Sequence, residues 1–203
     1  MIMRRSRIDH LLRAAADVTG QRRFVLIGSG AVIARSQNLP GNMMATPEID
    51  IYAADAEDVE AMSEQIDGSI GQNSAFHNEY GYYGDGVSPE TAKMPRDWQD
   101  RAIEYHGPDC PGVIAIVPEE NDIALAKLVA WREKDQVWLI HGLNAGILHL
   151  QTMADRLNQL PDTDPDRGVP PRGELERRLR QLGATCKIDF AIVAPSEPGR
   201  RPK

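Results

Sequence analysis

The stretch FVLIGSGAVIA, residues 24–34, limits the fold more than any other part of the sequence. Its apolar residues 24–27 predict a short buried strand, the Gly-Ser-Gly that follows predicts a turn, and residues 31–35 predict the beginning of a helix. A helix that follows such a turn exposes backbone N–H groups at its start, and these groups bind phosphate. The stretch therefore predicts an α/β unit with a candidate phosphate-binding turn at Gly28 and Ser29.

The segment TPEIDIY, residues 46–52, carries two acids one residue apart. Ile49 and Ile51 alternate with Glu48 and Asp50, which is the pattern of a strand with one apolar face. Residues two apart on a strand lie on the same face, roughly 6.6 Å from each other. Two neighbouring carboxylates repel unless a cation lies between them, and Mg²⁺ prefers such ligands and bridges them to substrate phosphates. Together with the turn, the pair predicts phosphoryl or nucleotidyl transfer.

Each of these two features also has an ordinary structural explanation. A Gly-Ser-Gly after a strand is commonly only a turn, and Glu-x-Asp on an edge strand is commonly a solvated face. The order of the two features and their closeness in the chain favour the functional interpretation.

The rest of the chain predicts an α/β core with a helical extension. Further strands are expected at residues 101–105 and 113–117, and helices at 7–18, 55–66, 121–140, 142–157 and 174–182. Residues 70–93, rich in Gly, Tyr, Ser and Asn, predict irregular structure with one hairpin around GYYGDGVSP. We expect a core at 1–118, a helical extension at 119–190, and a disordered tail at 191–203.

Composition excludes several classes of protein. The net charge of −7 argues against nucleic-acid binding by the whole surface, although a local basic patch is compatible with it. Two cysteines, Cys110 and Cys186, form neither a zinc cluster nor a disulfide framework; we expect reduced thiols, with one disulfide as the alternative. No apolar run approaches the ~18 residues of a membrane span, and the N-terminus does not resemble a signal peptide. We therefore expect a cytoplasmic protein with no membrane partner.

Gly-Ser, a helix, and two acids alternating with hydrophobic residues resemble the signature of the nucleotidyltransferase superfamily, which has the polymerase β fold. With SAFHNEYGYYGDGVSPETAKMPRDWQDR and DIALAKLVAWREKDQ, the opening resembles a small, uncharacterised bacterial family of nucleotidyltransferase-like proteins. That family is a distant relative of the AbiEii abortive-infection toxins. The resemblance covers residues 5–160, and AKLVAWREKD is its most specific part. It implies an α/β (α+β) fold, with a mixed sheet flanked by helices and a C-terminal helical extension.

The resemblance also implies roles for individual residues. The turn residues Gly28 and Ser29 match the triphosphate-binding turn, and Lys127 matches a lysine that contacts substrate phosphate. The catalytic set would be completed by the acid of the REKD block, Asp135. The residue pattern bears on Lys127 independently of the resemblance. Residues 123–131 would form a helix that is apolar on almost all sides, so the side chain of Lys127 must either extend to solvent or contact an anion.

The metal ligands implied by the resemblance are Glu48 and Asp50, which would hold Mg²⁺ or Mn²⁺. Glu48 departs from the superfamily, which usually has Asp there, and the interval from Ser29 to Glu48 is longer than usual. A third metal carboxylate is not obvious, and Glu104 on the expected strand 101–105 is the best candidate.

These observations lead to two functional hypotheses. In the first, the protein transfers a nucleoside monophosphate from a nucleoside triphosphate to a hydroxyl acceptor, which is tRNA, a protein or a small molecule. In the second, the fold is retained but catalysis is lost, leaving a binding or regulatory module; Glu48 and the missing third acid motivate this alternative. One version of either hypothesis makes it a toxin–antitoxin component with an antitoxin-type protein partner.

Overall fold

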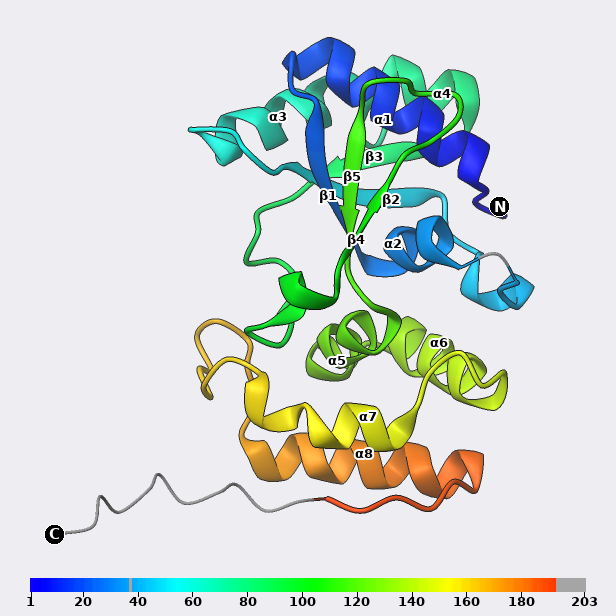
Figure 1. Cartoon of the computed structure of the whole chain (residues 1–203), viewed down its shortest axis with the longest axis vertical. Coiled ribbons are helices and arrows are strands. Elements are labelled where there is room, and N and C mark those ends of the chain that lie inside the picture. The colour runs from blue at the N-terminus through cyan, green and yellow to red at the C-terminus, as the bar shows by residue number, and fades with distance from the viewer. Residues whose placement is uncertain (37, 193–203) are drawn as a thin grey trace, which may run out of the picture.

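The computed structural model describes residues 1–36 and 38–192, and its centre is a mixed five-stranded sheet (Figure 1). The order of the strands is β3-β2-β1-β5-β4. β1 is parallel to β5 and β2 to β3, whereas the β1–β2 and β4–β5 pairs are antiparallel. The strands are β1 (Arg23–Ile27), β2 (Glu48–Ala53), β3 (Tyr83–Gly86), β4 (Ile103–Tyr105) and β5 (Ile114–Val117). The predicted α/β (α+β) class with a mixed sheet is confirmed.

Helices from the first half of the chain cover one face of this sheet (Figure 1). α2 and α3 contact β2, and α1 packs against both helices. Ile49 of β2 lies against Gly30 of α2, so Glu48 and Asp50, which alternate with Ile49, occupy the opposite face. These helices are α1 (Arg5–Thr19), α2 (Gly28–Arg35), α3 (Val59–Ile70) and α4 (Ala75–Tyr80).

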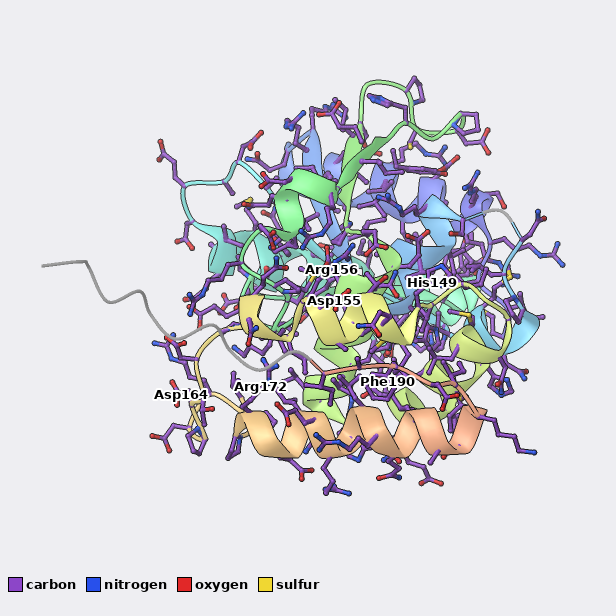
Figure 2. The ribbon with its side chains drawn as sticks, turned by 60° about the horizontal axis from the view of Figure 1, so that its bottom comes forward. His149, Asp155, Arg156, Asp164, Arg172 and Phe190 are labelled. Atoms are coloured by element: carbon purple, nitrogen blue, oxygen red, sulfur yellow. The ribbon has the colours of Figure 1, made fainter. Side chains whose placement is uncertain are left out.

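The second half of the chain forms a helical layer below the sheet (Figure 1). It contains α5 (Glu120–Ala130), α6 (Glu133–Asn144), α7 (Leu150–Asp155) and α8 (Arg172–Cys186). A buried ion cluster joins it to the core, because the carboxylate of Asp122 accepts from Arg101 at 2.8 Å and from Arg156 at 3.0 Å. Figure 2 shows the segment that carries Phe190 lying between α7 and α8. The predicted tail falls, from residue 193 on, outside the described residues.

The predicted hairpin in residues 81–89 is wrong, because this region forms strand β3, parallel to β2. Its glycines indicate a turn by sequence, but the structure uses them for close packing. A Cβ on Gly86 would overlap the backbone of Ser63 in α3, and one on Gly84 would crowd Ile70. Small residues therefore allow α3 to lie directly against this strand.

The predicted continuous helix 121–140 is also wrong, because it breaks at Trp131. Trp131 has φ 53°, a left-handed conformation that is unusual for a residue with a side chain. Arg178 of α8 stabilises the break: its guanidinium donates to the carbonyls of Leu128 and Val129 and lies 5.4 Å from the Trp131 ring. Helix α6 therefore starts in a new direction. The helix predicted at 142–157 is likewise interrupted between α6 and α7.

Candidate active site

Gly28 and Ser29, predicted as part of a turn, are the first residues of helix α2 and lie next to the acid pair. The antiparallel register of β1 and β2 places Ile27, the last residue before the turn, opposite Asp50. Gly28 has φ 66°, and a Cβ at this position would overlap the Oδ2 of Asp50. Only glycine satisfies both conditions, since it tolerates the left-handed region and leaves room for the carboxylate. Residues that are separated in sequence therefore form one corner of the molecule.

Glu48 is held by two partners on the same side of the sheet as Asp50. The hydroxyl of Tyr83 donates to its Oε2 at 3.0 Å, and the ammonium of Lys134 lies 3.2 Å from its Oε1. Partial burial acts to raise the pKa of Glu48, but the contacts with Lys134 and Tyr83 outweigh burial and keep this pKa below its ordinary value. Glu48 is therefore an anion.

Asp50 differs from Glu48, because none of the described residues donates a hydrogen bond to its carboxylate. Burial, followed by the neighbouring charges of Glu48 and Asp85, raises the pKa of Asp50 to about 6. A carboxylate that receives no hydrogen bond and lies beside other acids is typical of a cation-binding site.

Asp85 is a third carboxylate, which the sequence pattern did not reveal. The parallel register of β2 and β3 places it directly opposite Asp50, so the two share a face of the sheet. Burial, then the nearby carboxylates of Asp67 and Glu48, raises its pKa. The signal was present as the alternation of Tyr83 and Asp85 in YYGDG, but the glycines beside it favoured a turn.

Glu104, the predicted third metal ligand, does not join this group. Glu104 is on the edge strand β4 and lies opposite Ile116 of β5. Strands β5 and β1 separate it from β2, where the residue in the same row is Tyr52. It is therefore three strands away from β2, roughly 14 Å at the usual strand spacing. Its carboxylate pairs with Arg23 at 2.9 Å. The prediction of Glu104 as a third metal ligand is therefore wrong, and the acid that lies next to Asp50 is Asp85.

Across a cavity from the acids, Lys127 of α5 is held in place by Asp135. The ammonium of Lys127 lies 3.1 Å from Asp135 Oδ1 and 4.9 Å from the centre of the Trp138 ring. Burial lowers the pKa of Lys127, and the charges of Asp135 and Asp50 oppose that effect. Lys127 is therefore a buried cation near the acid pair.

Asp135 is fully buried and has no free oxygen for a substrate. Besides Lys127, it accepts from the side chain of Arg132 at 2.7 Å and from the Arg132 backbone N–H at 3.3 Å. It thereby caps α6 and fixes the direction of Lys127. The structure therefore places Asp135 behind Lys127 and not among the cavity-lining residues, and its predicted catalytic role stays a prediction.

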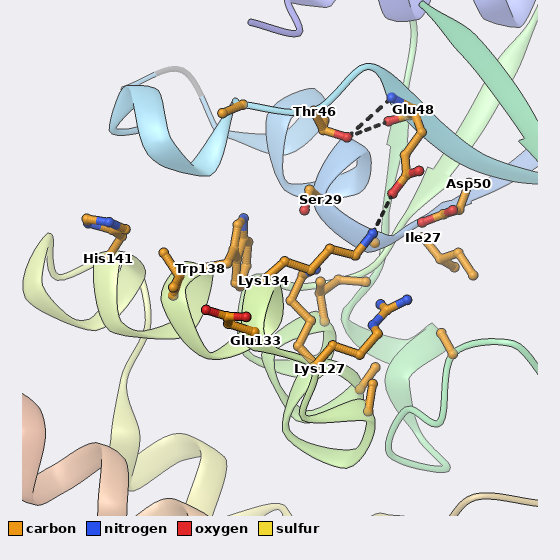
Figure 3. Close-up of a pocket in the computed structure, with 18 of the residues that line it drawn as sticks. Ile27, Ser29, Thr46, Glu48, Asp50, Lys127, Glu133, Lys134, Trp138 and His141 are labelled. Carbon is orange, nitrogen blue, oxygen red and sulfur yellow. Dashed lines mark hydrogen bonds and ion pairs between the residues drawn. The ribbon is translucent and has the colours of Figure 1, made fainter. Parts of the chain in front are cut away.

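A cavity of about 760 Å³ lies between the acids of β2 and Lys127 (Figure 3), and Asp85 and Asp135 are not among the residues that line it. Its volume lies in the range of small-molecule sites. One part contains Gly28, Ser29, the two acids of β2 and Lys127. The other extends along α6 to Trp138 and His141.

The donor set fits a divalent ion whose shell is completed by substrate. Within the described part of the chain, no group of three or more His, Cys, Asp or Glu is arranged to hold a metal ion. Mg²⁺ commonly takes only one or two protein carboxylates, together with water and phosphate oxygens. Glu48 and the donor-free Asp50 supply two.

A family model described as a nucleotidyltransferase of unknown function (DUF6036) matches residues 6–165, most of the chain. The chain belongs to this family. The DUF6036 match contains the turn, both acids of β2, Asp85 and Lys127, whereas α8 follows it. The suspected nucleotidyltransferase relationship is thus confirmed, while the distant relation to AbiEii toxins stays a prediction.

No curated protein and no solved structure matches the chain. Among the described helices of this DUF6036 protein, none has the length and apolar character to cross a membrane.

Proposed function

We propose that this protein is a Mg²⁺-dependent nucleotidyltransferase, with Mn²⁺ as an alternative ion. One observation carries the proposal: the donor-free carboxylate of Asp50 lies beside Glu48, against the Gly28 turn and facing the cavity that also contains Lys127. Membership of a nucleotidyltransferase family supports a nucleoside triphosphate as the substrate.

The reaction transfers a nucleoside monophosphate to a hydroxyl group. The acceptor oxygen attacks the α-phosphorus, the bond from this phosphorus to the bridging oxygen breaks, and pyrophosphate leaves. The N–H groups and hydroxyl of Gly28 and Ser29 bind the β- and γ-phosphates at the start of α2. Lys127 offsets the negative charge that develops on the pyrophosphate.

Glu48 and Asp50 would hold the divalent ion, which supplies charge neutralisation and polarises the phosphate when it is bound. Asp85 is placed next to Asp50 and its raised pKa makes it a stronger base than an ordinary aspartate. We assign to Asp85 the removal of the proton from the acceptor hydroxyl.

The acceptor is a tRNA, a protein or a small molecule, and the protein is proposed to act in the cytoplasm. A role as the toxin of a toxin–antitoxin pair, with an antitoxin-type protein partner, belongs to the same proposal and follows from the resemblance to AbiEii relatives.

Incubation with Mg²⁺ and each of four labelled nucleoside triphosphates, together with tRNA, protein and small hydroxyl acceptors, tests the reaction. We expect labelled product from the wild type, none from Asp50→Ala, and wild-type product from Asp17→Ala, which changes an exposed acid of α1. Absence of both transfer and magnesium-dependent nucleotide binding in the wild type would refute the proposal.

A second candidate function is a binding or regulatory module without catalysis. The observation that favours it is the engagement of both Glu48 oxygens by Tyr83 and Lys134. Thermal melting separates the two candidates, because a bound ligand stabilises the folded state. A rise in Tm with nucleotide and Mg²⁺ supports the enzyme, whereas no rise, together with co-purification of one protein partner, supports the module.

A further inference from the structure

Lys134 forms a contact across the mouth of the cavity. It lies in the first turn of α6, and its ammonium reaches over to Glu48 of β2, 3.2 Å from Oε1 (Figure 3). Its side chain is 61% exposed, whereas that of Glu48 is 29% exposed. The contact joins the helical layer to the sheet at one of the two proposed metal ligands.

The two lysines of the cavity are held very differently. Lys127 is 11% exposed and bound to the fully buried Asp135, so moving it would remove one of the two cations that balance that buried charge. Among the described residues, Lys134 forms an ion pair with Glu48 alone, and its side chain is mostly solvated. Exposed ion pairs contribute only about 0–1 kcal/mol, so the Lys134 contact can be exchanged for another at small cost.

A divalent cation at Glu48 and Asp50 would compete directly with the ammonium of Lys134. Both cations use a Glu48 oxygen, and they repel each other at short distance. The displaced side chain remains anchored at the cavity mouth, beside the position proposed for the triphosphate. Its flexible stem and three N–H donors suit it to bind phosphate oxygens there.

We infer, on the basis of the proposed function, that Lys134 exchanges partners: it occupies Glu48 in the metal-free protein and contacts the triphosphate when a divalent ion is present. The ion then releases a phosphate-binding cation, and the triphosphate gives that cation a new partner. Metal and nucleotide therefore strengthen each other's binding, and this coupling is reciprocal.

The test compares the wild type with Lys134→Met and a matched control, Lys93→Met. Lys93 lines the neighbouring groove beside Ala92, so the control removes the same charge near the site without touching Glu48. Binding of Mn²⁺ alone is measured by paramagnetic resonance, and binding of ATP with and without Mn²⁺ by calorimetry. We expect Lys134→Met to bind Mn²⁺ alone about 3–5-fold more tightly and ATP with Mn²⁺ about 10-fold more weakly.

The outcomes separate this inference from the proposed function. If the wild type binds neither Mn²⁺ nor ATP, the proposed function fails. If the wild type binds both but Lys134→Met behaves like Lys93→Met, or binds Mn²⁺ more weakly, the partner exchange alone is overturned. Circular dichroism checks the fold, and Lys134→Gln takes the place of Lys134→Met if the latter does not fold.

Discussion

The carboxylate of Asp50 lies directly against the backbone of Gly28, at a corner formed by the pairing of β1 with β2. This relationship brings a candidate metal ligand to the start of α2, where phosphate is expected to bind. It also makes the identity of residue 28 part of the site, although the residue has no side chain.

Gly28→Ala should abolish divalent-ion binding and nucleotidyl transfer, because the new methyl group displaces Asp50. The left-handed φ adds a cost of about 1–2 kcal/mol to folding. Gly20→Ala is the matched control: Gly20 has φ 71°, but a Cβ added there would meet no atom within 4 Å, so only the conformational cost remains. Equal metal binding by the two variants, measured by Mn²⁺ titration, would contradict the role of the Gly28–Asp50 contact.

The metal-free protein should become less stable as the pH rises from about 4 to 6 through the titration of Asp50. Its pKa is about 6 in the folded chain and 3.8 by itself, so the folded state binds the extra proton in this window. Asp50→Asn removes the effect and should raise the free energy of unfolding by about 3 kcal/mol at pH 7.5, and this gain should become smaller toward pH 4. Thermal melting across this range measures it.

The control for that experiment is Asp17→Asn, an exposed acid on α1, which should leave the pH profile unchanged. A loss of stability at pH 7.5 in Asp50→Asn would show that this carboxylate is stabilised in the folded protein, in conflict with its lack of donors.

Asp85→Asn should lower the rate of transfer about 100-fold, the usual size of a general-base contribution, with little change in nucleotide affinity. Glu104→Gln should leave the rate within about twofold, because Glu104 pairs with Arg23 three strands from the site. Steady-state kinetics of both variants shows which of the two, Asp85 or Glu104, is the third acid. The reverse ranking would restore Glu104 as the third acid.

Asp135→Ala should destabilise the protein by about 3 kcal/mol, because it leaves Lys127 buried without its ion-pair partner. Combining it with Lys127→Met should recover part of this loss, since no buried charge is then left unpaired on α5. A double-mutant cycle in urea measures the coupling. Glu133→Ala, an exposed neighbour at the start of α6, serves as the control. Additive effects of the two site substitutions would argue against the positioning role of Asp135.

Arg178→Ala should cost about 1–3 kcal/mol, because the last carbonyls of α5 lose their donor. The break at Trp131 should loosen, and the transfer rate should fall although Arg178 lies outside the cavity-lining residues. Arg180→Ala, on the same helix and 62% exposed, should change neither stability nor rate. Unfolding and kinetic measurements on the two variants test this. A normal transfer rate in a destabilised Arg178→Ala would show that the break between α5 and α6 does not affect the site.

Local patterns predicted the parts of the protein that depend on near neighbours in the sequence. The strand at 24–27, the helix after it and the acid-bearing strand were predictable because alternation and glycine placement act over a few residues, although this helix begins at Gly28, inside the predicted turn. The same patterns misled for β3 and for the helix at 121–140. Gly86 packs against α3, and the backbone turn at Trp131 is held by α8; both helices lie far from these residues in sequence.

That Glu48 and Asp50 share one face of a strand follows from the sequence, because an extended chain repeats every two residues. Which residues surround them depends on the tertiary fold. Strand register placed Gly28 and Asp85 beside Asp50 and left Glu104 three strands away, while the turn at Trp131 brought Lys134 to Glu48. The reason is physical: pairing and packing join residues that are distant along the chain, and one local pattern is compatible with many such pairings.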